Sequence, residues 1–217
     1  MLASAYLVKR YLYPNLAFTE VAAIPLVSVL AQVIAYLIVF VFMVLLLKQH
    51  GDNFWKTIQW NRPANWFGYV LGGILLSLAL QAFANLLPMP KETPMDRFFQ
   101  TAREAWILSV FGITMAPFLE ELFFRGFLYP VLARRWGVAV AVVLTSLGFS
   151  LIHAQQLGKA WGPLLIIFIV GLVLTITRAM TKSVASGVLI HIAYNATISV
   201  IFFAATDGFR NFEKLNR

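Results

Sequence analysis

The sequence contains no cysteine and few charged residues. Without cysteine the chain has no disulfide bond, no thiolate metal site and no thiol nucleophile. Only 12% of its 217 residues are charged, whereas about 25% is usual in soluble domains. The composition therefore excludes cysteine-based catalysis and argues against a soluble domain.

Apolar residues dominate instead. They make up 60% of the chain, and the mean hydropathy is +0.79. Several apolar runs reach the length that crosses a bilayer. The net charge of +8 comes from Lys and Arg in the short loops between these runs, which is typical of anchoring to lipid head groups rather than of nucleic-acid binding. We therefore expect an all-α, polytopic membrane helix bundle embedded in the lipid bilayer. Nucleic acid is not expected as a partner.

Six apolar segments are expected to cross the membrane. They cover residues 21–47, 66–87, 105–132, 138–153, 162–176 and 184–205. Gly72 and Gly73 in the second segment should allow a close approach of another helix. The loop charges do not decide the membrane orientation, and the oligomeric state also stays open.

The remaining segments are expected at the membrane surface. Residues 1–20 resemble an interfacial lead-in without a cleavable signal peptide, and 48–65 a surface segment with a solvated His50. Arg178 and Lys182 should mark the turn between the last two spans. Residues 207–217 are polar, so a frayed tail is expected there.

One short stretch, Glu120-Glu121-Leu122-Phe123-Phe124-Arg125, places three ionisable groups inside the third apolar segment. An ionised side chain near the centre of a bilayer costs about 2.5–3.5 kcal/mol even on lenient scales, so such residues normally face a bundle interior or a wet cavity. Glu121 and Arg125 share a helical face, whereas Glu120 projects about 100° away from Glu121. We predict a structural Glu121–Arg125 ion pair and a Glu120 that points into a cavity, ready for proton transfer. The alternative is a pair that only pins two helices together.

Other polar residues are expected at a similar depth. Pro117 lies three residues before Glu120 and should kink the helix and free a carbonyl group beside the cavity. With a rise of about 1.5 Å per residue, four polar side chains fall in a band about 10–23 Å deep from one side. They are Glu120, His153, His191 and Asn195. We predict that these four side chains form one site.

Three motifs, in this order, resemble the signature of the CPBP family of intramembrane proteases. They are EExxxR from Glu120 to Arg125, FxxxH from Phe149 to His153, and HxxxN from His191 to Asn195. The family includes the CAAX-processing enzymes of prenylated proteins and the Abi-like bacterial proteins of bacteriocin processing and self-immunity.

The resemblance covers about residues 105–205 and implies a catalytic CPBP-like core there. Residues 1–104 would supply variable N-terminal spans and surface segments, within a single membrane domain of residues 1–217. The first two spans carry no family motif, so the resemblance says nothing about them.

The resemblance implies hydrolysis of peptide bonds within the bilayer. Glu120 would act as general base on a water molecule that His153 also holds, and would then protonate the leaving amine. His191 and Asn195 would donate hydrogen bonds to the developing oxyanion, an interaction worth about 3–4 kcal/mol per donor in other enzymes. Structural support would come from the other motif residues, Glu121, Arg125 and Phe149.

The family name also suggests a metalloprotease, in which zinc or another divalent metal could bind Glu120, His153 and His191. The sequence lacks HExxH, the spacing that places two His ligands and a base on one turn of helix. We therefore favour activation of water by Glu120 without a tightly held metal or other cofactor. The metal-dependent protease stays as an alternative.

Two other classes of protein stay open. A proton-coupled transporter also uses buried Glu and His residues, although the sequence shows no inverted repeat. A non-catalytic bacteriocin-immunity scaffold would keep the fold without the chemistry. For the protease we expect a peptide or membrane-protein substrate, and the compact chain looks like a multi-pass protein of a prokaryotic cell membrane. The sequence does not reveal the natural substrate or whether it is prenylated.

Overall fold

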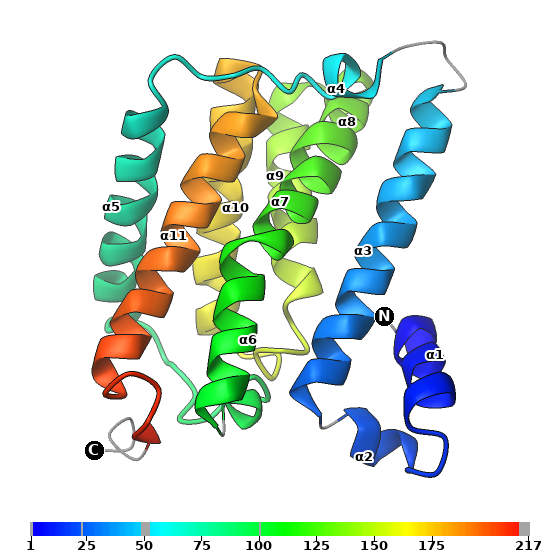
Figure 1. The fold of residues 1–217 in the computed structure, drawn as a ribbon. Helices are drawn as coiled ribbons and strands as arrows, with labels where there is room; N and C mark the ends of the chain where they lie inside the picture. Colours follow the sequence, from blue (N-terminus) through cyan, green and yellow to red (C-terminus); the bar gives the residue numbers. More distant parts are fainter. Residues whose placement is uncertain (1, 23, 49–52, 100, 213–217) are drawn as a thin grey trace.

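The computed structural model describes residues 2–22, 24–48, 53–99 and 101–212, and the regular secondary structure in these residues is helical (Figure 1). The elements are α1 (Leu2–Leu12), α2 (Phe18–Ala22), α3 (Pro25–Lys48), α4 (Phe54–Thr57), α5 (Trp66–Ala84), the 3₁₀-helix η1 (Asp96–Phe98), α6 (Ala102–Ile113), α7 (Met115–Glu121), the π-helix η2 (Leu122–Leu128), α8 (Tyr129–Trp136), α9 (Val138–Ile152), α10 (Trp161–Thr181) and α11 (Val184–Ala205). The predicted all-α class is confirmed.

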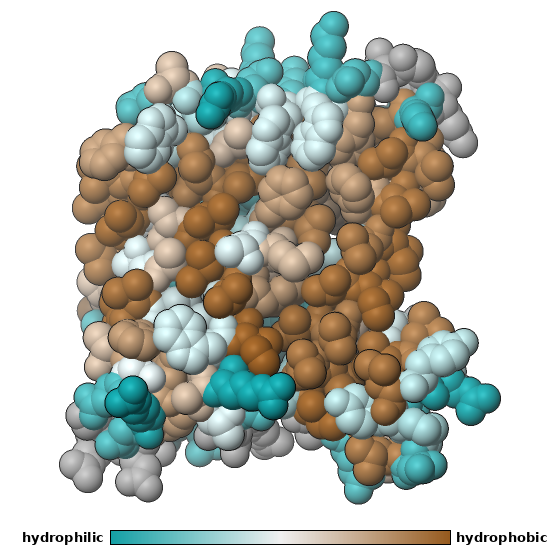
Figure 2. Space-filling model, in the orientation of Figure 1, coloured by the Kyte–Doolittle hydropathy of each residue, from teal (hydrophilic) through white to brown (hydrophobic). Residues whose placement is uncertain are grey.

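All six predicted apolar segments are helical. Within the described residues, five helices are long and apolar enough to cross a membrane: α3, α5, the run from α6 to α8, α10 and α11. The sixth, α9, is apolar but has only 15 residues. Figure 2 shows an apolar band across the middle of the molecule and hydrophilic residues at its two ends. The chain is therefore an integral, multi-pass membrane protein with the predicted bundle architecture.

The run α6–α8 lies between α11 on one side and α3 on the other (Figure 1). Helix α11 packs against both α5 and α10, and α10 packs against α9. Contact between α5 and α11 is close at Gly73, where a Cβ atom would lie 2.4 Å from the carbonyl oxygen of Ile190. A Cβ atom on Gly72 would meet nothing within 4 Å. The predicted close approach is thus confirmed at Gly73 only.

One expectation about the end of a helix is wrong. Helix α10 continues to Thr181, so Arg178 lies inside the helix, where it is 4% exposed. The turn itself begins at Lys182, whose φ of 50° is left-handed. Arg178 can be buried because the Arg125 carbonyl oxygen accepts a hydrogen bond from its Nε.

The C-terminal tail is also more ordered than expected, as far as the structure describes it. Phe209 is 1% exposed and packs edge-on against Trp106 and Phe203. Residues 207–212 therefore fold back onto α6 and α11, because burial of an aromatic ring outweighs the polarity of its neighbours. Residues 213–217 of the predicted frayed tail, and His50 of the predicted surface segment, lie outside the described residues.

Candidate active site

The helix that carries the acidic motif is broken just before it. Helix α6 ends and α7 begins at Thr114, whose backbone angles are φ −110° and ψ −78°. Pro117 has no N–H and cannot bond the carbonyl group four residues earlier, which explains the break. The carbonyl oxygen of Gly112, beside the break, accepts a hydrogen bond of 2.7 Å from Asn195 Nδ2. The predicted kink is confirmed, and the Gly112 carbonyl oxygen beside it is bound by a motif residue.

Directly after the two glutamates the helix changes to π geometry over Leu122–Leu128. Such turns are rare and are frequent at functional sites, because they free backbone groups and redirect side chains. The Arg125 carbonyl oxygen lies in this turn and accepts a hydrogen bond of 3.1 Å from Arg178 Nε. Arg178 thus holds the backbone that presents Arg125, a contact that the sequence analysis missed.

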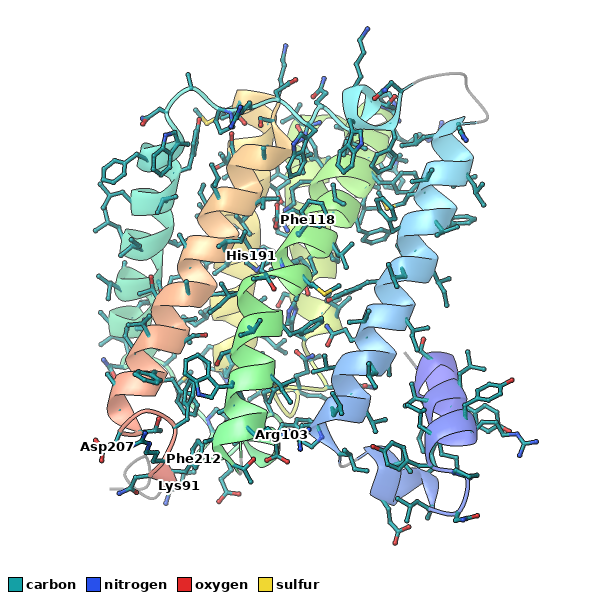
Figure 3. All side chains as sticks on the ribbon, in the orientation of Figure 1. Lys91, Arg103, Phe118, His191, Asp207 and Phe212 are labelled. Atoms are coloured by element: carbon teal, nitrogen blue, oxygen red, sulfur yellow. The ribbon has the colours of Figure 1, made fainter. Side chains whose placement is uncertain are left out.

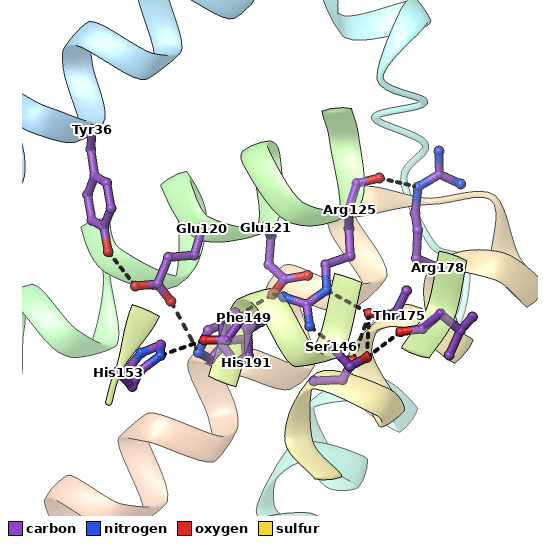
Figure 4. Close-up of polar contacts among 12 residues, drawn as sticks. Tyr36, Glu120, Glu121, Arg125, Ser146, Phe149, His153, Thr175, Arg178 and His191 are labelled. Atoms are coloured by element: carbon purple, nitrogen blue, oxygen red, sulfur yellow. Dashed lines mark hydrogen bonds and ion pairs between the residues drawn. The ribbon is translucent and has the colours of Figure 1, made fainter. Parts of the chain in front are cut away.

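Glu121 and Arg125 form the predicted ion pair (Figure 4). The distance between Arg125 Nη1 and Glu121 Oε1 is 2.8 Å, and both side chains are completely buried. The guanidinium also donates from Nε to Thr175 Oγ1 at 3.2 Å and from Nη2 to the Gly171 carbonyl oxygen at 3.0 Å. A buried charge has lost its hydration and is stable only when an opposite charge and hydrogen bonds replace it, as they do here. The pair fastens the acidic helix to α10.

Glu120 points away from this pair, as predicted. It is 5% exposed and lines a cavity of about 260 Å³ together with His153. Its Oε2 lies 3.9 Å from His191 Nε2. Figure 4 shows Glu120, His153 and His191 converging, and Figure 3 shows that His191 lies at mid-depth in the bundle. Three of the four predicted site residues therefore meet around one carboxylate.

His191 connects the two glutamates. Its Nδ1 lies 3.1 Å from Glu121 Oε1 while its Nε2 faces Glu120. Because a carboxylate oxygen accepts, Nδ1 carries the proton in this contact. The imidazole ring also packs edge-on against Phe149, with ring centres 5.6 Å apart. Phe149 in turn lies 4.5 Å below the Arg125 guanidinium, so the three motifs form one packed unit.

His153 follows the last residue of α9. Its Nδ1 lies 2.8 Å from the carbonyl oxygen of Phe149. A carbonyl oxygen can only accept, so Nδ1 is the donor and Nε2 of the neutral ring is left as an acceptor. The FxxxH spacing thus places the His at the position where its ring bonds the last turn of its own helix.

Asn195 departs from the expected position. It is half-buried and lines a second cavity, of about 730 Å³, together with Gly112. Lys91 and Phe212 line the same cavity and lie at one end of the molecule (Figure 3). The prediction that Asn195 joins the Glu120 cavity is wrong, because its amide binds the Gly112 carbonyl oxygen beside the helix break instead.

Residues 102–197 match the family model described as type II CAAX prenyl endopeptidase, Rce1-like. This domain belongs to the CPBP family of intramembrane proteases. The matched segment contains all three motifs, from Glu120 to Asn195. The match supports, in general terms, a CAAX-type endopeptidase that acts in membranes. No curated protein and no solved structure matches the chain.

One neighbour of Glu120 comes from outside the matched segment. The Tyr36 hydroxyl on α3 donates a hydrogen bond to Glu120 Oε1, and Gln32 Nε2 donates to the Tyr36 hydroxyl at 2.7 Å. The sequence analysis named no site residue in the first two spans and so missed this contact. Gln32 is the strongly polar residue of its apolar span, and Tyr36 lies four residues later on the same face. This four-residue spacing is the feature of the sequence that could have indicated the contact.

The residues suggested as metal ligands are Glu120, His153 and His191. Among the described residues, no group of three or more His, Cys, Asp or Glu side chains is arranged to hold a metal ion. His191 Nδ1 bonds Glu121, and Tyr36 bonds Oε1 of Glu120, so His191 Nε2 and Glu120 Oε2 are the atoms that could bind a metal. Activation of water without a metal stays a prediction.

Proposed function

We propose that this CPBP-family protein is an intramembrane endopeptidase that hydrolyses peptide bonds of membrane-associated peptides or proteins with Glu120 as general base. The observation that carries the proposal is a carboxylate 5% exposed, at a cavity in the middle of the bundle, with two histidines beside it. Such a group is expensive inside a membrane unless it has a function. The setting that we propose is a prokaryotic cell membrane, which stays a prediction.

Glu120 and His153 would activate the water molecule. The Glu120 carboxylate offers acceptor sites, and His153 offers Nε2 because its Nδ1 is bound to the Phe149 carbonyl oxygen. Two acceptors that line one cavity can take both protons of a single water molecule. The lone pairs of the water oxygen would then point away from both residues, towards the carbon of a substrate carbonyl group. Transfer of one proton to Glu120 generates the attacking hydroxide.

His191 would stabilise the oxyanion that forms when hydroxide adds to the carbonyl carbon. Its Nδ1–H is bound to Glu121, so donation from Nε2 requires the doubly protonated ring. Asn195 lines the other cavity and binds the Gly112 carbonyl oxygen, so it is given no part in this step. A donor such as His191 acts on charge that exists only in the transition state, which is the efficient use of a hydrogen bond in catalysis.

Collapse of the tetrahedral intermediate breaks the C–N bond. The leaving nitrogen takes the proton that Glu120 received from water, so the carboxylate is regenerated. The products are one fragment with a new carboxyl group and one with a new amino group. Tight burial of Glu121 and Arg125 keeps the helix in place through the cycle.

Metal removal is expected to leave cleavage unchanged. The described side chains form no three-ligand cluster, and the proposed activation of water needs only Glu120 and His153. Elemental analysis of the purified protein should give far less than one metal ion per chain, and treatment with a chelator should not change the rate. A stoichiometric metal whose removal abolishes cleavage would overturn this part of the proposal.

Glu120→Ala is expected to remove a specific set of peptide fragments from cells. Membrane proteomes of cells that produce the wild-type protein or the variant at equal levels should differ in new termini, since only the carboxylate can generate the hydroxide. His153→Ala should remove the same termini, and Glu20→Ala on the distant helix α2 should not. Identical sets of termini in all four strains would count against an endopeptidase.

A further inference from the structure

A tyrosine outside the family segment contacts the proposed general base. Tyr36 lies on α3, whereas the family match begins at residue 102. Its hydroxyl group donates to Glu120 Oε1 across the cavity that Tyr36 itself lines (Figure 4). The contact joins the N-terminal spans directly to the reacting carboxylate.

The direction of this hydrogen bond is fixed by a third residue. Gln32 Nε2 is a donor, and it lies 2.7 Å from the Tyr36 oxygen. The tyrosine oxygen therefore accepts from Gln32, and its own proton goes to Glu120. In this arrangement Oε1 is an acceptor and carries no proton of its own.

The tyrosine ring is itself held in position. It stacks on Phe111 of α6, with ring centres 6.4 Å apart and an interplanar angle of 15°. Gln32 is one helical turn before Tyr36 on α3, so the two side chains share the face that lines the cavity. A ring packed between two helices can offer its hydroxyl at one fixed point.

We infer that Tyr36 is a positioning residue for Glu120, and this inference rests on the proposed function. The hydroxyl group fixes Oε1, so that Oε2 is held towards His191, 3.9 Å away. A carboxylate has about four acceptor sites, so one bond from tyrosine leaves others for water. Helix α3 therefore belongs to the catalytic unit, although it carries none of the three motifs.

Tyr36→Phe tests the inference because it keeps the ring on Phe111 and removes only the hydroxyl group. We expect kcat to fall about 10- to 100-fold, the range for loss of a hydrogen bond to a charged group. KM should stay within about twofold, since the hydroxyl group does not hold the substrate. Tyr69→Phe on α5 is the matched control and should leave kcat unchanged. The melting temperature of each variant reports on folding.

Gln32→Leu tests whether the glutamine acts through the tyrosine. Alone it should lower kcat about three- to tenfold, because the hydroxyl group loses the donor that orients it. In the Tyr36→Phe background it should have no further effect, since there is no hydroxyl left to orient. Additive losses would show that Gln32 acts on the site in some other way. They would count against a chain of hydrogen bonds from Gln32 through Tyr36 to Glu120.

Reactivity of Glu120 gives a readout that needs no substrate. Dicyclohexylcarbodiimide enters membranes and modifies carboxyl groups in their protonated form, and mass spectrometry of the labelled peptide measures the rate. Tyr36→Phe should raise labelling of Glu120 about threefold or more. Without the tyrosine hydroxyl group, Oε1 is more accessible to the reagent and no longer receives the hydrogen bond that favours its unprotonated form.

The outcomes separate the two proposals. If Glu120→Gln abolishes cleavage while Tyr36→Phe changes neither kcat nor labelling, the protease assignment stands and the inference about Tyr36 is wrong. If the protein cleaves nothing but labelling still rises in Tyr36→Phe, the contact is supported and the proposed reaction fails.

Discussion

Glu120→Gln is expected to lower kcat by about 100- to 10,000-fold, the range over which general base catalysis contributes. Glutamine has nearly the same size, and its carbonyl oxygen can still accept from the Tyr36 hydroxyl. It cannot take up the proton of water, so only the chemical step should suffer. Single-turnover cleavage of an identified substrate in lipid vesicles measures the effect, with the melting temperature as a check on folding.

Two variants make this result specific. Glu20→Gln removes a carboxylate that bonds the backbone of Ala17 on the surface, and should retain full activity. His153→Ala should lose less activity than Glu120→Gln. The double variant should be no slower than Glu120→Gln alone, because both residues would act on the same water molecule. An activity of Glu120→Gln within tenfold of wild type would exclude Glu120 as the base.

Arg125→Met is expected to lower the free energy of unfolding by about 3–5 kcal/mol, the usual cost of breaking a buried ion pair from one side. Methionine fills much of the arginine volume but leaves Glu121 charged and unpaired in a completely buried position. The Gly171 carbonyl oxygen also loses its donor from Nη2. Unfolding in mixed detergent micelles, followed by tryptophan fluorescence, measures the loss.

The double variant Glu121→Gln and Arg125→Met should recover a large part of that stability. It removes both charges, and the glutamine oxygen still accepts from His191 Nδ1. Arg135→Met, at an exposed arginine of α8, is the matched control and should change stability little. A double variant as unstable as Arg125→Met would show that an unpaired carboxylate is not the cause.

Hydropathy was sufficient to predict the membrane-spanning segments. The last one was predicted with the bounds that the structure shows, Val184–Ala205, because an apolar run between two polar loops has one way to cross a membrane. Ends that depend on packing were predicted less well. Helix α10 extends past its last apolar residues because Arg178 finds a partner on another helix, which no local pattern reveals.

The ion pair of Glu121 and Arg125 was predictable because helical geometry alone brings residues four apart together. The same geometry explains why the side chains of Glu120 and Glu121 point in different directions. Asn195 was not predictable in this way. It shares a face with His191, but the Gly112 carbonyl oxygen of another helix binds its amide at the helix break.

The sequence by itself determined the membrane bundle, the three motifs and the ion pair, since apolar run length and helical spacing are local properties of the chain. Tertiary structure decided which groups surround Glu120. Tyr36 is 84 residues away in sequence and His191 comes from the last helix, so only the packing of α3 and α11 against the broken helix could bring them to one carboxylate. Contacts of that range depend on where helices cross, and the order of residues along each helix does not specify the crossing.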